Sequence, residues 1–328
     1  INIIIFVLLV NNFVLNVVNL FFICLLVIFL CSTSNIISFL LVLEWNGLLV
    51  VLIMFLCLSF NVSESVFIYF ILNTLVFIIF LWGVVLSNEE LIVLSLFLKL
   101  GFFPFIWWFP YLSDTLNYYL LFIFSVIQKL FPLLLIYWNS CIVLSSILIA
   151  VILNVFISLI NLGYNQNNIK VFLAWSSNIN YSWILYIFFK AWSYGFSYYW
   201  FYVLSFTVFV SFLNSVNEFW DQICVTNWLS LLVCLITFCS FSGFPPFIGF
   251  YYKVLFFSAL EERGTFCKSY LVYMVLCGLF FIWNSFIYIN MLFKLNINKW
   301  FFGVSDYSFI GYGLVIVYIF FSLYIIYI

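Results

Sequence analysis

The chain has 328 residues, of which 69% are hydrophobic and 6% are charged, and its formal net charge is −1. Soluble domains carry about 25% charged residues, so this composition, with a mean hydropathy of +1.33, excludes a chain made of soluble domains. The near-zero net charge excludes a nucleic-acid-binding protein, which needs basic patches.

Apolar runs separated by short polar turns predict an all-α, polytopic bundle of about eleven transmembrane helices, each near the roughly 20 residues that cross a bilayer. The first run has no basic segment and no cleavage-site pattern, so we expect a helix of the mature protein, not a signal peptide. The predicted spans are 2–30, 35–59, 63–86, 91–109, 115–138, 141–162, 168–190, 193–216, 227–260, 269–293 and 306–328.

Cofactor ligands are scarce in this sequence. It contains no histidine, and its nine cysteines include no C-x-x-C pair. His-ligated haem is thereby excluded, and iron–sulfur and zinc sites are not expected. We therefore expect no cofactor and no metal in this chain. The 47 phenylalanines indicate a T-rich genome, and the initial isoleucine indicates either an unconventional start codon or trimming. We expect the chain to be organelle-encoded.

Four charged residues fall well inside predicted spans: Glu44, Lys99, Lys129 and Lys253. A charge at the centre of a membrane helix costs about 2.5–3.5 kcal/mol on insertion scales. Such side chains must therefore face the interior of the bundle. One interpretation is structural, a buried lysine paired with Glu44. That interpretation leaves two central lysines without an intramembrane acid.

The second interpretation is a series of proton carriers. Burial disfavours the charged form of a lysine and a nearby carboxylate favours it, so a buried lysine can switch its protonation state. Glu64, Lys170 and Asn180 are candidate auxiliary residues. Glu64 is either a favourable acid in the first turn of a helix after an N-cap at Ser63 or a functional acid, and Lys170 is either functional or a lysine that snorkels from a helix end.

Four of the five prolines lie close to a central lysine, and two of these groups include a glycine. A helix proline frees the carbonyl four residues earlier, which predicts free carbonyls at Leu100, Gln128, Phe241 and Ser242. The stretch Gly101–Phe105 is echoed by Gly243–Phe247, and interrupted helices at matching places in two halves are typical of inverted-repeat transporters. The predicted helix-break residues are Gly101, Pro104, Pro132, Gly243, Pro245 and Pro246.

This echo predicts a single membrane domain, 1–328, with two five-helix repeats. The first repeat covers approximately 1–138 and the second approximately 141–293. The helix at 306–328 would then be additional.

Six collinear segments of the chain resemble one family, subunit 2 of NADH–ubiquinone oxidoreductase (respiratory complex I), an antiporter-like membrane subunit. The segments are Leu43-Glu44-Trp45-Asn46; Glu64 with Tyr69-Phe70 and Asn73; Leu98-Lys99-Leu100-Gly101 with Pro104-Phe105 and Trp108-x-Pro110; Gln128-Lys129 with Pro132-Leu133; Asn165-Gln166 with Lys170, Ala174 and Ser176-Ser177; and Gly243-Phe244-Pro245-Pro246 with Gly249-Phe250 and Lys253.

The resemblance implies that Glu44, Lys99, Lys129 and Lys253 lie on a proton pathway and that the fourth and ninth helices are discontinuous. It also implies that Glu44 and Lys99 approach each other. Two histidines usual in the family are replaced here by Ile106 and Asn180, so Asn180 or water would have to substitute in the pathway.

The function implied is proton translocation by a membrane-arm subunit, driven by electron transfer elsewhere in NADH:ubiquinone oxidoreductase. NADH, FMN, iron–sulfur clusters and ubiquinone would be held by other subunits of the complex, and there is no redox centre in this chain. The implied partners are the other membrane-arm subunits and the lipids of the mitochondrial inner membrane. Two alternatives stay open: a subunit of an Mrp-type cation/proton antiporter and an inert membrane scaffold.

Overall fold

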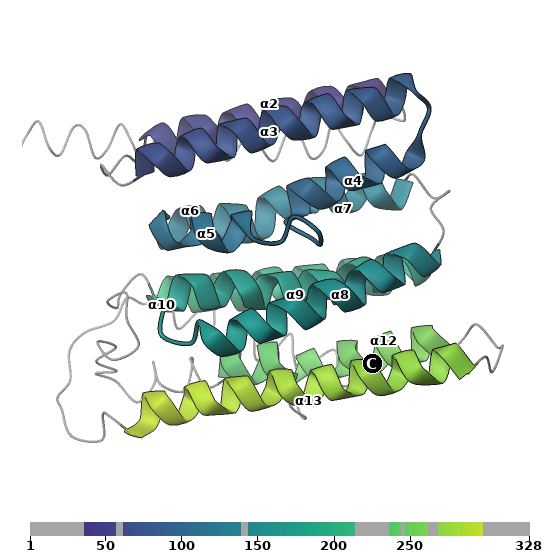
Figure 1. Cartoon of the computed structure of the whole chain (residues 1–328). Coiled ribbons are helices and arrows are strands. Elements are labelled where there is room, and N and C mark those ends of the chain that lie inside the picture. Colours follow the sequence, from purple (N-terminus) through teal and green to yellow (C-terminus); the bar gives the residue numbers. More distant parts are fainter. Residues whose placement is uncertain are drawn as a thin grey trace, which may run out of the picture. The chain divides into compact units, whose positions relative to one another are not determined.

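The computed structural model describes residues 36–56, 62–138, 144–213, 236–243, 247–261 and 268–297, and these residues form mostly helices (Figure 1). The chain divides into two compact units, Ile1–Ile142 and Val143–Ile328. Each predicted span from the second to the tenth has a helical counterpart, which confirms the all-α fold class. The first and eleventh spans lie outside the described residues.

Unit 1 is a bundle in which α2 packs on α3, α3 on α4, and α4 on α7. Because α2, α3, α4 and α7 pack on one another, polar side chains on their facing surfaces can meet. The elements are α2 (Ile36–Leu56), α3 (Val62–Val85), α4 (Glu89–Leu100), α5 (Trp108–Thr115), α6 (Tyr118–Phe122), the π-helix η1 (Ile123–Ile127) and α7 (Gln128–Trp138).

Unit 2 is arranged around α9, which packs against α8, α10 and α12. Almost every described side chain of α9 is buried, as expected for a helix with neighbours on all sides. The elements are α8 (Leu144–Tyr164), α9 (Ile169–Lys190), α10 (Trp192–Leu213), a helical segment at 236–242, α12 (Ile248–Glu261) and α13 (Lys268–Ile297). Figure 1 shows α8 and α9 side by side.

Three helical stretches of the described residues are long and apolar enough to cross a membrane by length and composition. They are Ser38–Phe55, Glu64–Val85 and Tyr118–Ile136. Two shorter apolar stretches, Leu148–Tyr164 and Val275–Asn290, accompany them. The last long stretch runs through α6, η1 and α7, so the predicted span 115–138 is continuous but contains a π-helical segment.

The fourth predicted span is interrupted, as expected. Helix α4 ends at Leu100, and Gly101 has a left-handed φ of 69°, which a residue without Cβ adopts at little cost. The Gly101 N–H donates to the Leu98 carbonyl at 3.2 Å and the Phe102 N–H to the Phe97 carbonyl at 2.9 Å, the pairing that closes many helix C-termini. The chain resumes as α5 and extends the span to Thr115, beyond the predicted end at 109.

The ninth predicted span is interrupted in the same way. The helical segment at 236–242 ends at Gly243, whose φ is 72°. The Gly243 N–H donates to the carbonyls of Cys239 at 3.1 Å and Ser240 at 3.2 Å. Helix α12 then begins at Ile248. The two discontinuous helices predicted from the sequence are therefore confirmed.

The prolines differ in what they do. Pro132 lies inside α7, as predicted. Pro104 lies in the loop between α4 and α5, after a cis peptide bond, so the prediction that it frees a carbonyl within a continuous helix is wrong. Gly101 has already ended the helix. Pro245 and Pro246 lie outside the described residues, and the two five-helix repeats stay a prediction.

Candidate functional site

The three central lysines are buried, as their positions in apolar spans predict. The exposed fractions of Lys99, Lys129 and Lys253 are 8%, 2% and 5%. An ammonium withdrawn from water needs hydrogen-bond acceptors or an aromatic face to offset its lost hydration. The three sites supply these partners differently.

Lys99, on the last turn of α4, is bound by groups from two other helices. Its Nζ donates to the Leu43 carbonyl of α2 at 2.8 Å and to Asn73 Oδ1 of α3 at 3.0 Å. The Asn73 Nδ2 donates in turn to Glu44 Oε2 at 3.3 Å. Glu44 and Lys99 therefore approach each other as expected, but within the described residues they form no direct ion pair, because Asn73 joins them.

A second polar cluster surrounds Gln128, the first residue of α7. The amides of Gln128 and Asn46 exchange hydrogen bonds at 3.3 and 3.5 Å. The Tyr69 hydroxyl donates to Gln128 Oε1 at 3.2 Å. Asn46 follows Glu44 on α2 and Tyr69 precedes Asn73 on α3, so the same two helices supply both clusters.

Lys129 follows Gln128 directly, at the junction between η1 and α7. Its ammonium lies 4.4 Å from the centre of the Phe109 ring of α5, a distance at which the ring attracts a cation. The π-helical turn before it and Pro132 after it both disturb the backbone hydrogen-bond ladder. Single π-turns of this kind recur at functional sites.

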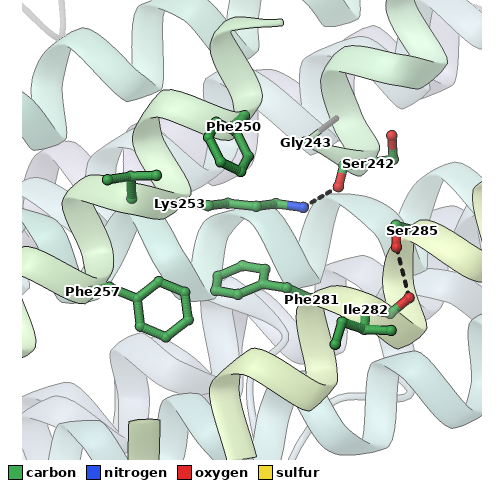
Figure 2. Close-up of a pocket in the computed structure, with 9 residues that line it drawn as sticks. Ser242, Gly243, Phe250, Lys253, Phe257, Phe281, Ile282 and Ser285 are labelled. Atoms are coloured by element: carbon green, nitrogen blue, oxygen red, sulfur yellow. Dashed lines mark hydrogen bonds between the residues drawn. The ribbon is translucent and has the colours of Figure 1, made fainter. Parts of the chain in front are cut away.

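Lys253, on α12, points back to the break that precedes its helix. Figure 2 shows its side chain passing Phe281 and donating to the carbonyl of Ser242. The ammonium lies 4.9 Å from the centre of the Phe281 ring. The sequence predicted a free carbonyl at Ser242, and the structure identifies its partner as the lysine itself.

A pocket of about 240 Å³ lies beside Lys253. Its lining combines the polar groups at the break with apolar side chains of α12 and α13 (Figure 2). Gly243 adopts a left-handed φ, and a Cβ at this position would overlap the end of the Lys253 side chain, which would have to shift. The lining residues are Ser242, Gly243, Phe250, Lys253, Val254, Phe257, Phe281, Ile282 and Ser285.

The auxiliary residues lie in three different settings. Glu64 is exposed in the first turn of α3, and because α3 begins at Val62, Ser63 lies inside the helix and is not its N-cap. Lys170 is buried in the first turn of α9, contrary to the expectation of a snorkelling side chain. Asn180 is buried on α9, where it accepts from the Tyr198 hydroxyl at 3.4 Å and donates to the Ser176 carbonyl at 3.1 Å.

Sequence reasoning gave no role to the uncharged amides Asn46, Asn73 and Gln128, although each belongs to a motif that carried the family resemblance. All three are at least 95% buried. A buried amide in an apolar helix is costly unless it is hydrogen-bonded. The presence of amides within the apolar spans was therefore a usable signal, alongside the charges.

These groups suit proton transfer better than bond-making chemistry. They offer an acid, three amines and amides that both donate and accept hydrogen bonds, inside a bundle of apolar helices. Within the part of the chain that the structure describes, no three His, Cys, Asp or Glu side chains gather where they could hold a metal ion.

No family model matches the chain. Curated relatives named NADH-ubiquinone oxidoreductase chain 2 do match it. The protein of Anopheles gambiae is 30% identical over 199 residues, covering 59% of this chain and 58% of the relative. The protein of Myxine glutinosa is 29% identical over 193 residues, covering 56% and 54%. The chain thus matches a little over half the length of these relatives, and they confirm the resemblance found in the motifs.

Solved structures show the same fold at low sequence identity. A chain of respiratory complex I from Thermus thermophilus superposes with a TM-score of 0.76 at 19% identity, covering 90% of this chain and 73% of the other. A chain of the Mrp complex from Dietzia gives 0.69 at 14% identity, covering 84% and 59%. A chain of an archaeal membrane-bound sulfane sulfur reductase gives 0.76 at 15%, covering 89% and 69%. The chain therefore shares its fold with a chain of each of these three complexes.

Proposed function

We propose that this chain is a membrane-arm subunit of NADH:ubiquinone oxidoreductase that translocates protons, driven by electron transfer in other subunits. The observation that carries the proposal is the burial of three lysines in an apolar helical bundle with the antiporter-like fold. Lysines that served only solubility would be at the surface. The similarity to proteins named NADH-ubiquinone oxidoreductase chain 2 supports the choice of complex.

In this proposal Glu44, Lys99, Lys129 and Lys253 carry protons, and Glu64, Lys170 and Asn180 are auxiliary. A charged lysine passes a proton to an acceptor when its charged form loses support, and the neutral amine takes a proton from a donor such as water when a nearby carboxylate favours the charged form. Asn73 and Gln128 can relay hydrogen bonds because each amide both donates and accepts. The helix breaks at Gly101 and Gly243 expose backbone carbonyls that water or a lysine can use.

The chain holds no redox centre in this proposal. NADH, FMN, the iron–sulfur clusters and ubiquinone are bound by other subunits, which are also its protein partners. The chain lies in the mitochondrial inner membrane and crosses the lipid several times. It is encoded by the organelle. The two five-helix repeats, 1–138 and 141–293, are part of the same proposal.

A subunit of a cation/proton antiporter is the second candidate, because a chain of an Mrp complex shares the fold. The two candidates differ in their neighbours. Purification of the chain from membranes under mild conditions should bring down NADH dehydrogenase activity. Recovery without that activity would instead support the antiporter.

The decisive test is Lys129→Met in the assembled complex. Methionine keeps most of the side-chain volume and removes the charge. If the chain is only a scaffold, the complex should therefore assemble and oxidise NADH as before. A proton carrier should assemble but lose NADH-driven proton uptake several-fold, measured in reconstituted vesicles with complex content normalised. Lys190→Met, at the last residue of α9, is the control and should change little. Unchanged uptake in fully assembled Lys129→Met would support the scaffold.

A further inference from the structure

Asn73 occupies the gap between the two charged groups of unit 1. Its Nδ2 faces the Glu44 carboxylate at 3.3 Å and its Oδ1 faces the Lys99 ammonium at 3.0 Å. A carboxylate only accepts hydrogen bonds and an ammonium only donates them. An amide satisfies both neighbours in this one orientation, so the arrangement requires a side chain that both donates and accepts hydrogen bonds.

The backbone opposite makes room for this side chain. Gly47, one turn after Glu44 on α2, lies so close to Asn73 that a Cβ there would overlap the Asn73 amide. Asn73 itself is 3% exposed. The amide is therefore confined between α2 and α4, and its two hydrogen bonds are not those of a surface side chain.

The bridge keeps the two charges close without a direct ion pair. A direct pair buried at this site would hold the proton on Lys99 through a strong attraction. With the amide between them, the carboxylate still favours the charged lysine but at longer range. Displacement of the amide would let the two groups close into an ion pair or leave Lys99 with only its hydrogen bond to the Leu43 carbonyl.

From this geometry we propose that Asn73, seated against Gly47, is a positioning residue that sets the electrostatic coupling between Glu44 and Lys99. The inference rests on the proposed function, because it assigns the coupling to proton transfer. Asn73 neither gains nor loses a proton. Its effect is exerted through the distance and hydrogen bonding of its two neighbours.

The first test replaces the amide in the assembled complex. Asn73→Leu has a similar volume and removes both hydrogen bonds, so NADH-driven proton uptake should fall about tenfold to a hundredfold, as for a misplaced reacting group. Asn73→Asp has the same shape and keeps the acceptor toward Lys99. Its added carboxylate favours the charged lysine, so the alkaline limb of the pH profile should move to higher pH. The added charge would move that limb for a packing residue as well, so the discriminating variant is the uncharged Asn73→Ala, in which loss of a positioning residue shifts the limb and loss of a packing residue leaves it in place.

The second test moves the amide without replacing it. Gly47→Ala introduces only a methyl group, which must push Asn73 aside, and should lower uptake severalfold. In the Asn73→Ala background the overlap is gone, so Gly47→Ala should add little further loss. Gly278→Ala is the matched control, because a Cβ at Gly278 meets nothing within 4 Å, and it should leave uptake unchanged.

The outcomes separate this inference from the function on which it rests. Full uptake and an unmoved pH profile in the uncharged Asn73 variants, with uptake lost in Lys99→Met, would overturn the role of Asn73 alone. An equal loss from Gly47→Ala with and without Asn73 would also overturn it. Full uptake in Lys99→Met and Glu44→Gln as well would overturn the proposed function itself.

Discussion

The two broken helices use the same backbone device but place their lysines on opposite sides of it. Gly101 and Gly243 both turn in the left-handed region. Lys99 precedes its glycine and reaches away from the break, to an α2 carbonyl and to Asn73. Lys253 follows its glycine and reaches back to a carbonyl of the break itself. One lysine is thus coupled to an acid through an amide, and the other to the backbone.

At each break one carbonyl accepts a hydrogen bond from a side chain, and the two donors differ. In unit 1 the indole Nε1 of Trp108, on the resumed helix α5, donates to the Leu98 carbonyl at 2.8 Å. In unit 2 the Lys253 ammonium does the equivalent work at Ser242. At the first break a neutral donor, the Trp108 indole, binds the carbonyl. Lys99 is not needed there and can interact with Glu44 through Asn73. At the second break Lys253 is both the candidate proton carrier and the donor to the Ser242 carbonyl. Loss of its proton would therefore also weaken the hydrogen bond at the break.

The largest expected effect is a loss of stability when the glycine at either break is replaced by alanine. Alanine in the left-handed region costs about 1–2 kcal/mol at either position. At Gly243 it also overlaps the Lys253 side chain, which adds about 1–3 kcal/mol of overpacking. At Gly101 the nearest side-chain atom to a Cβ is at 3.3 Å, so the added strain is smaller.

We therefore expect Gly243→Ala to lower the yield and melting temperature of the assembled complex more than Gly101→Ala. Native gels and thermal unfolding of the purified complex measure both. Equal losses would mean that the space at Gly243 is not needed by Lys253, and that the two breaks depend only on backbone conformation.

An intermediate effect is expected from Trp108→Phe. The substitution keeps an aromatic ring but removes the hydrogen bond to the Leu98 carbonyl, which retains only the Gly101 N–H at 3.2 Å. A lost bond to a part-buried carbonyl costs about 1 kcal/mol, so the melting temperature should fall modestly while the pH profile stays in place.

Trp82→Phe, at a 59% exposed tryptophan of α3, is the control for Trp108→Phe and should change neither quantity. A pH profile that moved in Trp108→Phe would show that the first break, like the second, is tied to the protonation of its lysine. The contrast between the two breaks would then be lost.

Much of this comparison was predictable from sequence, because it depends on local patterns. Apolar runs predicted the helices. Gly101 and Gly243, each two or three residues before a proline in an apolar span, predicted both breaks. The position of Pro104 outside a helix was not predictable, because Gly101 ends α4 before the proline is reached. Local patterns also predicted the burial of Lys129 but not the Phe109 ring that faces it.

Local sequence patterns could not predict the hydrogen-bonded bridge through Asn73. It depends on three helices meeting in one register, and nothing in the separation of residues 44, 73 and 99 along the chain fixes that register. The partner of Lys253 was predicted only in part. The Ser242 carbonyl was expected to be free, but its donor comes from α12, eleven residues later in the chain. Contacts of this kind follow from tertiary packing and not from spacing.

The smallest expected effect concerns Asn180, the residue that stands where the resembled family usually has a histidine. Its link to Tyr198 is a long hydrogen bond of 3.4 Å, whereas the Tyr198 ring is stacked on Tyr252, the neighbour of Lys253, at 4.5 Å and 5°. Tyr198→Phe removes the hydroxyl and keeps the stack, so proton uptake should change by no more than about twofold, because a long neutral hydrogen bond contributes at the low end of its usual range, about 0.5 kcal/mol. Tyr198→Leu removes the stack as well and should lower the melting temperature further, since an aromatic pair contributes about 0.5–1.5 kcal/mol beyond its buried area.

A large loss of uptake in Tyr198→Phe, with assembly intact, would instead place Asn180 and the Tyr198 hydroxyl in the proton path. Unit 2 would then contain an amide-linked route comparable to the one through Asn73 in unit 1.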